Sequence, residues 1–336
     1  MWKTKVIVLK DTMHLVSKKT KVLVCGATGF IGRNIVETLL LNQNYEVTAT
    51  YHIRQPFYNN RIKWKKVNLL NVEEVESAIN GIDIIIQSAA VTTGINQVFI
   101  NPEVHVTDNV IMNSLIFRAA HKYKVKNLVF FSCTTILQNS ETPLKEEDFN
   151  ASLELYPKYF GSGWTKIYLE KMCEFFSRIG DTKFTIIRHS NVYGPWDKFD
   201  LINSHVFGAT ISKILSQNSE IEIWGTGREK RDLIYVGDLV DLVLIAIEKQ
   251  NNGFEIYNAG GKDFLSISDL VIRIMNIAGK VLDIKYDLTK PATNFSVRLD
   301  STKAKRDFGW TQKESLDSGI EKTINFWLKE KERLFK

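Results

Sequence analysis

The stretch that decides the fold is residues 22–32, Val22-Leu23-Val24-Cys25-Gly26-Ala27-Thr28-Gly29-Phe30-Ile31-Gly32. Its apolar first part predicts a buried strand, because glycine punctuation and then a helical pattern follow it directly. The helical pattern consists of apolar residues at helical spacing, namely Ile35, Val36, Leu39 and Leu40. In a strand–turn–helix unit of this kind, the first glycine permits a tight turn, the second lets the backbone approach a pyrophosphate, and the third lets helix and strand pack closely.

The glycine-rich turn predicts a dinucleotide-binding loop. The N-terminus of the following helix offers free N–H groups and the positive end of the helix dipole to phosphates. We therefore expect cofactor contacts from six residues of the loop: Gly26, Thr28, Gly29, Phe30, Ile31 and Gly32. The alternative is a merely tight structural turn, and the strand before the loop and the helix after it favour the dinucleotide.

The end of the second predicted strand, residues 45–51, decides between NAD and NADP. An acidic residue there would hold the ribose 2′-OH of NAD, whereas a basic residue accommodates the 2′-phosphate of NADP. Tyr51 fills the position and is followed by His52, Ile53 and Arg54, with no carboxylate nearby. Arg54 is the natural phosphate partner, so the sequence favours NADP. If Arg54 is simply a surface charge, this preference for NADP over NAD is lost.

Apolar strands alternate with helices as far as residue 188. The strands predicted after residue 25 are 45–51, 67–69, 82–86, 128–131 and 184–187, and the helices are about 72–79, 104–123 and 163–179. This alternation is typical of a doubly wound parallel α/β sheet, the Rossmann fold. Beyond residue 188 the pattern is less regular. We expect a dinucleotide-binding domain from residues 20–188 and about 231–260, and a smaller substrate-binding lobe from 189–230 and 261–336.

The charge balance indicates a solvated surface. The 336 residues include 44 Lys and Arg against 38 Asp and Glu, a formal charge of +6, and acidic and basic residues are interspersed. A nucleic-acid-binding protein would cluster its cations on one face, so we expect neither nucleic acid nor membrane as a partner. Three scattered cysteines, Cys25, Cys133 and Cys173, fit a reducing compartment and form no CxxC metal motif. We expect a cytoplasmic protein without a metal site.

Five segments together resemble the extended short-chain dehydrogenase/reductase family, the nucleotide-sugar epimerases, dehydratases and reductases. They are the glycine loop, Ile86-Gln87-Ser88-Ala89-Ala90, Asn109, Arg188-His189-Ser190-Asn191-Val192-Tyr193-Gly194-Pro195 and Arg231-Asp232-Leu233-Ile234-Tyr235-Val236-Gly237-Asp238. The resemblance covers nearly everything from Thr20 onward. It implies further cofactor contacts from Asn68, Leu69, Ala89, Ala90, Asn109, Lys166 and Arg188.

Within that family, the segment Asn203-Ser204-His205-Val206, with Lys213 and Trp224-Gly225-Thr226-Gly227, resembles the GDP-fucose synthase branch, which acts on GDP-4-keto-6-deoxyhexoses. The resemblance implies a nucleotide-diphosphate sugar as partner and substrate contacts from Asn191, His205, Val206, Lys213, Trp224, Arg231 and Arg298. Cations such as Arg231 suit a diphosphate. Taken singly, each of these cations is better explained as a surface charge. At the family's spacing a substrate contact is favoured for Arg231, whereas for Lys213 and Arg298 the two explanations stay even. His205 is either an acid/base group or a structural histidine.

The family's catalytic signature, Tyr-x-x-x-Lys on a helix with a Ser or Thr at the end of the preceding strand, is altered here. Lys166 matches the lysine, but Ser162 stands four residues earlier in place of the tyrosine, and Cys133 replaces the strand-end hydroxyl. A serine hydroxyl has a short reach and a pKa far above that of a phenol, so Ser162 cannot simply replace the tyrosine. We therefore hypothesise that Tyr159, seven residues before Lys166, occupies the vacated space if that stretch is helical.

Other donors and other outcomes remain open. Thr134, Thr135 or His205 would supply the proton, or hydride transfer has been lost. The GDP-fucose-synthase-like branch carries a cysteine in its epimerising site where this chain has Thr135. The leading interpretation is therefore a nicotinamide-dependent enzyme on a nucleotide sugar, by C4 redox, epimerisation or both; a silenced nucleotide-sugar-binding protein is the alternative. The resemblance also implies a homodimer, paired through the helices predicted over 104–123 and 163–179.

Overall fold

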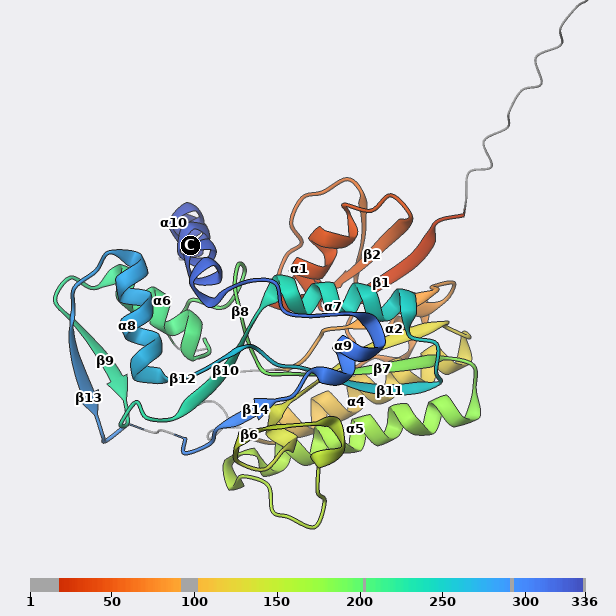
Figure 1. The fold of residues 1–336 in the computed structure, drawn as a ribbon. Helices are drawn as coiled ribbons and strands as arrows, with labels where there is room; N and C mark the ends of the chain where they lie inside the picture. The colour runs from red at the N-terminus through yellow and green to blue at the C-terminus, as the bar shows by residue number, and fades with distance from the viewer. Residues whose placement is uncertain (1–17, 92–101, 202–203, 291–292, 335–336) are drawn as a thin grey trace, which may run out of the picture.

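A seven-stranded parallel sheet forms the centre of the computed structural model, which describes residues 18–91, 102–201, 204–290 and 293–334 (Figure 1). The strand order is β11-β7-β5-β4-β1-β2-β3. Their bounds are β1 Thr20–Cys25, β2 Tyr45–Tyr51, β3 Ile62–Lys66, β4 Ile84–Gln87, β5 Asn127–Cys133, β7 Lys183–His189 and β11 Phe254–Ala259. The doubly wound Rossmann fold that the sequence predicts is confirmed. The order reverses between β1 and β4, and ligands bind beyond the carboxyl ends of the strands at such a switch point.

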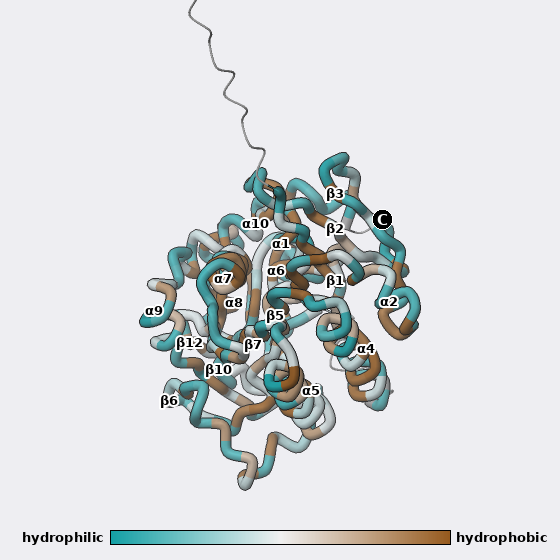
Figure 2. Tube along the Cα trace, turned by 90° about the vertical axis from the view of Figure 1, so that its right-hand side faces the viewer, coloured by the Kyte–Doolittle hydropathy of each residue, from teal (hydrophilic) through white to brown (hydrophobic). Residues whose placement is uncertain are grey.

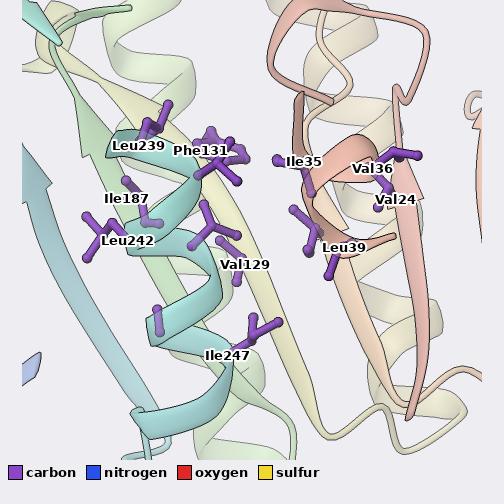
Figure 3. Close-up of a cluster of buried hydrophobic side chains, with 14 of the residues drawn as sticks. Val24, Ile35, Val36, Leu39, Val129, Phe131, Ile187, Leu239, Leu242 and Ile247 are labelled. Carbon is purple, nitrogen blue, oxygen red and sulfur yellow. The ribbon is translucent and has the colours of Figure 1, made fainter. Parts of the chain in front are cut away.

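Helices cover both faces of this sheet, so its central strands are apolar on both sides. On one face lie α1 (Phe30–Leu39), α7 (Val236–Lys249) and α9 (Thr302–Phe308). Figure 3 shows Ile35 and Leu39 of α1 and Leu239 of α7 packed beside residues of the strands. On the other face lie α2 (Val72–Ile79), α4 (Pro102–Lys122) and α5 (Phe160–Ile179).

A smaller lobe lies beside the carboxyl ends of the strands (Figure 1). Its three-stranded sheet has the order β12-β10-β8, from Asp263–Ser266, Lys230–Tyr235 and Asn191–Tyr193. A parallel pair, β9 (Glu220–Trp224) and β13 (Asp283–Asp287), lies with it. The helices are α6 (Val206–Ser216), α8 (Ile267–Ala278) and α10 (Leu316–Leu334), and they share one apolar cluster.

Short elements join the two parts. Strands β6 (Ser140–Leu144) and β14 (Val297–Leu299) pair in parallel. Three turns of 3₁₀ helix follow β5: η1 Thr134–Ile136, η2 Glu146–Asp148 and η3 Pro157–Tyr159. Among the described residues, no helix is long and apolar enough to cross a membrane.

Two predicted element positions were wrong. Residues 67–69 form no strand; the strand in this region is Ile62–Lys66, at the edge of the sheet. An edge strand has one neighbour and a partly exposed surface, so its sequence can be half polar. Helix α5 begins at Phe160, earlier than predicted, and Gly163 is buried within it. The division into two domains remains a prediction. Strand β11, assigned to the dinucleotide-binding domain, extends the large sheet, whereas β10, assigned to the same domain, belongs to the three-stranded sheet. Helix α9, assigned to the lobe, packs on the large sheet.

Candidate active site

The glycine loop leaves no room for side chains at its first and third glycines. Gly26 has φ +75°, and a Cβ there would lie 2.6 Å from the Cα of Ala89. A Cβ on Gly32 would lie 2.3 Å from the carbonyl oxygen of Gly26. The first glycine therefore makes a left-handed turn against the loop after β4, and the third lets α1 pack on β1.

The N-terminus of α1 fits a phosphate. Its N-cap is Gly29, which offers no side chain to the first N–H groups, and the first turn carries no acidic residue. Phe30 and Ile31 therefore present N–H groups that an anion can accept. Arg54 lies over the loop, where its Nη1 donates to the carbonyl oxygen of Thr28 at 3.1 Å. These features form a cradle for a dinucleotide pyrophosphate with a cation beside it.

Two neighbours of Arg54 complete this end of the site. Tyr51 packs edge-on against Trp64, with ring centroids 6.2 Å apart. Lys198, which sequence analysis missed, is close enough to Arg54 that the repulsion adds to the effect of burial in lowering the pKa of Lys198. Lys198 follows the Arg-x-x-Asn-Val-Tyr-Gly-Pro segment, and no pattern in that loop marks it as a site residue.

The loop after β4 is held by buried amides. Asn109 accepts from the N–H of Val91 at 3.1 Å and donates to the carbonyl oxygen of the same residue at 3.1 Å. Gln87 donates to Ala89 and to the side chain of Asn113, the latter at 2.9 Å. Asn109 thus fixes the loop that carries Ala89 and Ala90, and Asn113, which sequence analysis missed, supports it from one helical turn further on.

At the centre of the carboxyl edge, Lys166 reaches under β5. Its Nζ donates to the carbonyl oxygen of Phe131 at 2.7 Å and lies 4.6 Å from the ring centroid of Phe130. Burial lowers the pKa of Lys166, and the group that most favours its charged form is Cys133. The Sγ of Cys133 is 3.1 Å from the Oγ1 of Thr135. The structure therefore places a thiol beside the lysine.

The lobe brings predicted substrate residues to the same edge. Arg231 donates from Nη1 to the carbonyl oxygen of Phe295 at 2.9 Å and from Nη2 to the Oγ1 of Thr293 at 2.9 Å. Tyr159 interacts electrostatically with Arg231 and forms a side-chain hydrogen bond with Thr293. His205 is the N-cap residue of α6, immediately before Val206, and lies near enough to His189 to affect its pKa.

A second group of lobe residues gathers around Trp224. The Nζ of Lys213 lies 5.4 Å from the Trp224 ring centroid and donates to the carbonyl oxygen of Glu222 at 3.1 Å. The Nζ of Lys290 lies 5.8 Å from the same ring. The structure thus places Lys213 near Trp224, and it adds Lys290, which no motif indicated.

Comparison with known proteins decides the family. A model of the NAD dependent epimerase/dehydratase family matches residues 22–260. The chain belongs to this family. It is 28% identical to the GDP-L-colitose synthase of Yersinia pseudotuberculosis, covering 93% of this chain and 99% of that protein. It is 27% identical to the GDP-L-fucose synthase of Azorhizobium caulinodans, covering 93% and 97%.

A solved structure supports the same assignment. UDP-glucose 4-epimerase of Thermotoga maritima with UDP-glucose aligns with a TM-score of 0.83 and 26% identity, over 92% of this chain and 99% of that one. The family resemblance inferred from the sequence is therefore confirmed. The departures from the family's catalytic signature can now be placed in three dimensions.

Where the family places its tyrosine, this epimerase-family chain has a serine turned toward its own backbone. The Oγ of Ser162 donates to the carbonyl oxygen of Tyr159 at 3.3 Å. Tyr159 does not continue the helix of Lys166, because it ends η3 and α5 begins at the next residue. Its ring packs against Tyr156 and Phe295, with centroids 5.6 and 5.1 Å away. The charges that act on Lys166 include Cys133 and Glu170 but not Tyr159.

Three other predicted contacts have structural partners. Arg188 is 3% exposed and donates to Glu170 and to the carbonyl oxygen of Glu146, so we no longer expect it to contact the cofactor. Asn191 donates to the carbonyl oxygen of Asp232 at 3.0 Å and joins β8 to β10. Arg298 interacts with Asp232 and lies 5.9 Å from the Phe264 ring centroid.

Arg298 and Arg231 lie on opposite faces of the three-stranded sheet. Successive residues of a strand point to opposite faces, so Asp232 and Arg231 lie on opposite faces of β10, and Arg298 lies with the former. Of the remaining predicted residues, Asn68 and Leu69 follow β3 at the carboxyl edge, where the Asn68 side chain accepts from the N–H of Leu70 at 3.1 Å. Thr134 begins η1, directly after Cys133.

Proposed function

We propose that this chain is a nicotinamide-dependent enzyme that acts on a nucleotide-diphosphate sugar, by redox at the sugar C4, by epimerisation, or by both. The observation that carries the proposal is that one chain holds a dinucleotide cradle at Gly26–Gly32, the Lys166 centre, and a cationic and aromatic lobe surface around Trp224. A bound nicotinamide supplies the hydride acceptor or donor for such chemistry.

The lobe surface supports a nucleotide diphosphate as the recognised group. The Trp224 ring offers a flat face for a base, and the Nζ atoms of Lys213 and Lys290, 5.4 and 5.8 Å from its centroid, are cations for phosphate. Arg231, which interacts with Tyr159, adds a further cation for a phosphate group. The relatives named GDP-L-colitose synthase and GDP-L-fucose synthase favour guanine as the base.

The residues at the second strand support NADP as the cofactor. Arg54 and Lys198 supply two cations, and no carboxylate follows β2 to hold a ribose 2′-OH. With Thr135 in place of the branch's cysteine, the proposed reaction is a simple C4 reduction or oxidation or a single-centre epimerisation.

A silenced binding protein is the second candidate, and a specific observation favours it. Ser162 hydrogen-bonds to the main chain, and within the part of the chain that the structure describes no tyrosine is among the groups that shift the pKa of Lys166. The family's proton donor is therefore replaced at its own position. The two candidates differ in turnover and agree in binding.

Incubation with GDP-4-keto-6-deoxy sugars and NADPH separates them. If the chain is an enzyme, NADPH should be consumed and a new nucleotide sugar should form. If it is a silenced binding protein, both ligands should bind saturably with no turnover. Lack of binding of any nucleotide sugar, GDP- or UDP-linked, would contradict both candidates.

We also propose that two copies of the chain pair through α4 and α5. These helices pack side by side, and Figure 2 shows hydrophobic segments along both. Ile111, Tyr168 and Phe175 are exposed by 45%, 53% and 55% on this surface. Phe175→Glu should convert a dimer to a monomer in light scattering, whereas Val281→Glu, at a position 93% exposed elsewhere, should not. A wild-type monomer would contradict the pairing.

A further inference from the structure

His189 and Cys133 are neighbours at the carboxyl edge of the large sheet. Each is the last residue of its strand, and the parallel register of β5 and β7 pairs Cys133 with His189. Adjacent strands lie about 4.8 Å apart, and paired residues point to the same face of the sheet. The imidazole and the thiol therefore lie side by side at the edge where the family binds its ligands.

One ring nitrogen of His189 is fixed in its role. Nδ1 lies 2.8 Å from the carbonyl oxygen of Ser190. A carbonyl oxygen only accepts, so Nδ1 carries the hydrogen and Nε2 of the neutral ring carries the lone pair. Among the described residues, Nε2 has no hydrogen-bond partner. The ring thus presents a free proton acceptor.

Charged and titratable groups on three elements surround the ring. Lys166 faces it from α5, His205 from the start of α6, and Cys133 from β5. Burial, followed by repulsion from Lys166 and His205, lowers the pKa of His189 to about 4, although its hydrogen bond to Ser190 opposes this. At neutral pH the ring is therefore uncharged and ready to accept.

The other candidates near Lys166 are less available. The hydroxyl of Ser162 donates to a main-chain carbonyl, and the Oγ1 of Thr135 is 3.1 Å from the Cys133 sulfur. The Tyr159 ring is packed among aromatic rings, and burial raises its pKa. Of these groups, His189 alone combines a free acceptor with a position next to Lys166.

We propose that His189 performs the proton transfer that the family assigns to the missing tyrosine, an inference that rests on the proposed function. In the oxidising direction the C4–H bond of the sugar breaks and its hydride passes to the oxidised nicotinamide. The C4 hydroxyl becomes a carbonyl, and its proton passes to Nε2 of His189. In the reducing direction Nε2 first takes up a proton from solvent and then passes it to the sugar oxygen as the carbonyl accepts the hydride, so reduction through His189 is favoured at acid pH.

The test compares His189→Gln with His121→Gln, a substitution near the end of α4, away from the strands' carboxyl edge. Loss of a general base costs about 10²- to 10⁴-fold in rate. We expect His189→Gln to lower single-turnover hydride transfer from the sugar to NADP⁺ at neutral pH by at least about 100-fold, with unchanged binding of NADP⁺ and of the nucleotide sugar. Addition of imidazole to His189→Ala should restore part of the rate. An unchanged rate in His189→Gln would overturn the proposal.

The pH profile and a spectroscopic measurement add independent readouts. The oxidation rate of the wild type should stay level from alkaline pH down to about 5 and fall only as His189 becomes protonated. Tyr159 as acceptor would instead lose rate between alkaline and neutral pH. In the free protein, ¹⁵N NMR should show the Nδ1–H tautomer of His189 at neutral pH. The Nε2–H tautomer would overturn the proposal whether or not a substrate is known.

The failures of the two proposals are distinguishable. Failure of the wild type to bind any nucleotide sugar contradicts the proposed function. Wild-type turnover that His189→Gln leaves unchanged contradicts only the role of His189.

Discussion

Arg188 and Glu170 form a buried bidentate ion pair that joins β7 to α5. The Nε–Oε1 distance is 3.0 Å and the Nη2–Oε2 distance is 2.7 Å, with both side chains at most 5% exposed. Glu170 lies one helical turn after Lys166, so the pair fixes the rotation of α5 that directs Lys166 to the Phe131 carbonyl. An arginine predicted to contact the cofactor instead positions the helix that carries the lysine of the family's signature.

Removal of one partner should destabilise the protein strongly. Glu170→Ala leaves the Arg188 guanidinium buried without its counter-charge, which costs about 3–5 kcal/mol. The double variant Glu170→Leu/Arg188→Met should recover most of that loss, because it removes both charges. Urea unfolding measures the three free energies. A loss below about 1 kcal/mol in Glu170→Ala would show that the pair does not hold α5.

Gly32→Ala should abolish dinucleotide binding. Its Cβ would lie 2.3 Å from the Gly26 carbonyl oxygen, so α1 must move away from the loop that it supports. Gly253→Ala is the matched control, because the nearest atom to its Cβ would be 3.7 Å away. Fluorescence titration with NADPH measures both variants. Binding by Gly32→Ala at wild-type affinity would contradict the assignment of the loop.

Arg54→Ser should change which cofactor is preferred. Loss of a charge-assisted contact to the 2′-phosphate weakens NADPH binding by roughly 10-fold or more and leaves NADH binding nearly unchanged. Arg61→Ser, at an exposed position before β3, is the control. Equal weakening of NADPH and NADH would indicate that Arg54 supports the loop rather than the phosphate.

Asp197 should make stability fall as pH rises. Burial raises the pKa of Asp197 to about 7, and its buried Oδ2 has no hydrogen-bond partner among the described residues. The native state therefore holds a proton that the unfolded chain releases between about pH 4 and pH 7, so the free energy of unfolding decreases through this window. Relative to Asp197→Asn, the wild type should lose up to about 1.4 kcal/mol per pH unit there.

Urea unfolding at several pH values measures that difference, with the exposed Asp181→Asn as control. If the gap between wild type and Asp197→Asn stays constant from acid to neutral pH, the carboxyl is not protonated in the native state.

The parts of the structure that local sequence determines were predictable. The apolar run of β1, the glycines and the amphipathic α1 are contiguous in the sequence. The turn at Gly26, and the close contact between Gly32 and Gly26 that excludes a Cβ, involve residues of this same short segment. Arg54 likewise follows the end of the second strand in the sequence, and in the structure it lies at the loop. The family resemblance also assigned Lys213 and Trp224 to the substrate, and the two side chains lie near each other.

Features that depend on distant residues were not predictable. The role of Arg188 depends on Glu170 of another element, and the role of His189 depends on its register with Cys133. Tyr159 was assigned to the face of Lys166 on the assumption of a continuous helix, and a 3₁₀ turn interrupts it there. Edge strand β3 was misplaced because its sequence is half-polar and carries no strong strand pattern.

The most direct test of the central claim is transfer of deuterium from C4-deuterated NADPH to a nucleotide 4-keto sugar, followed by mass spectrometry and NMR of the product. The proposed function predicts one deuterium at the sugar C4, transferred by the wild type and not by Lys166→Met. Tight binding of both ligands by the wild type with no deuterium in the sugar would contradict the claim that this chain catalyses redox chemistry.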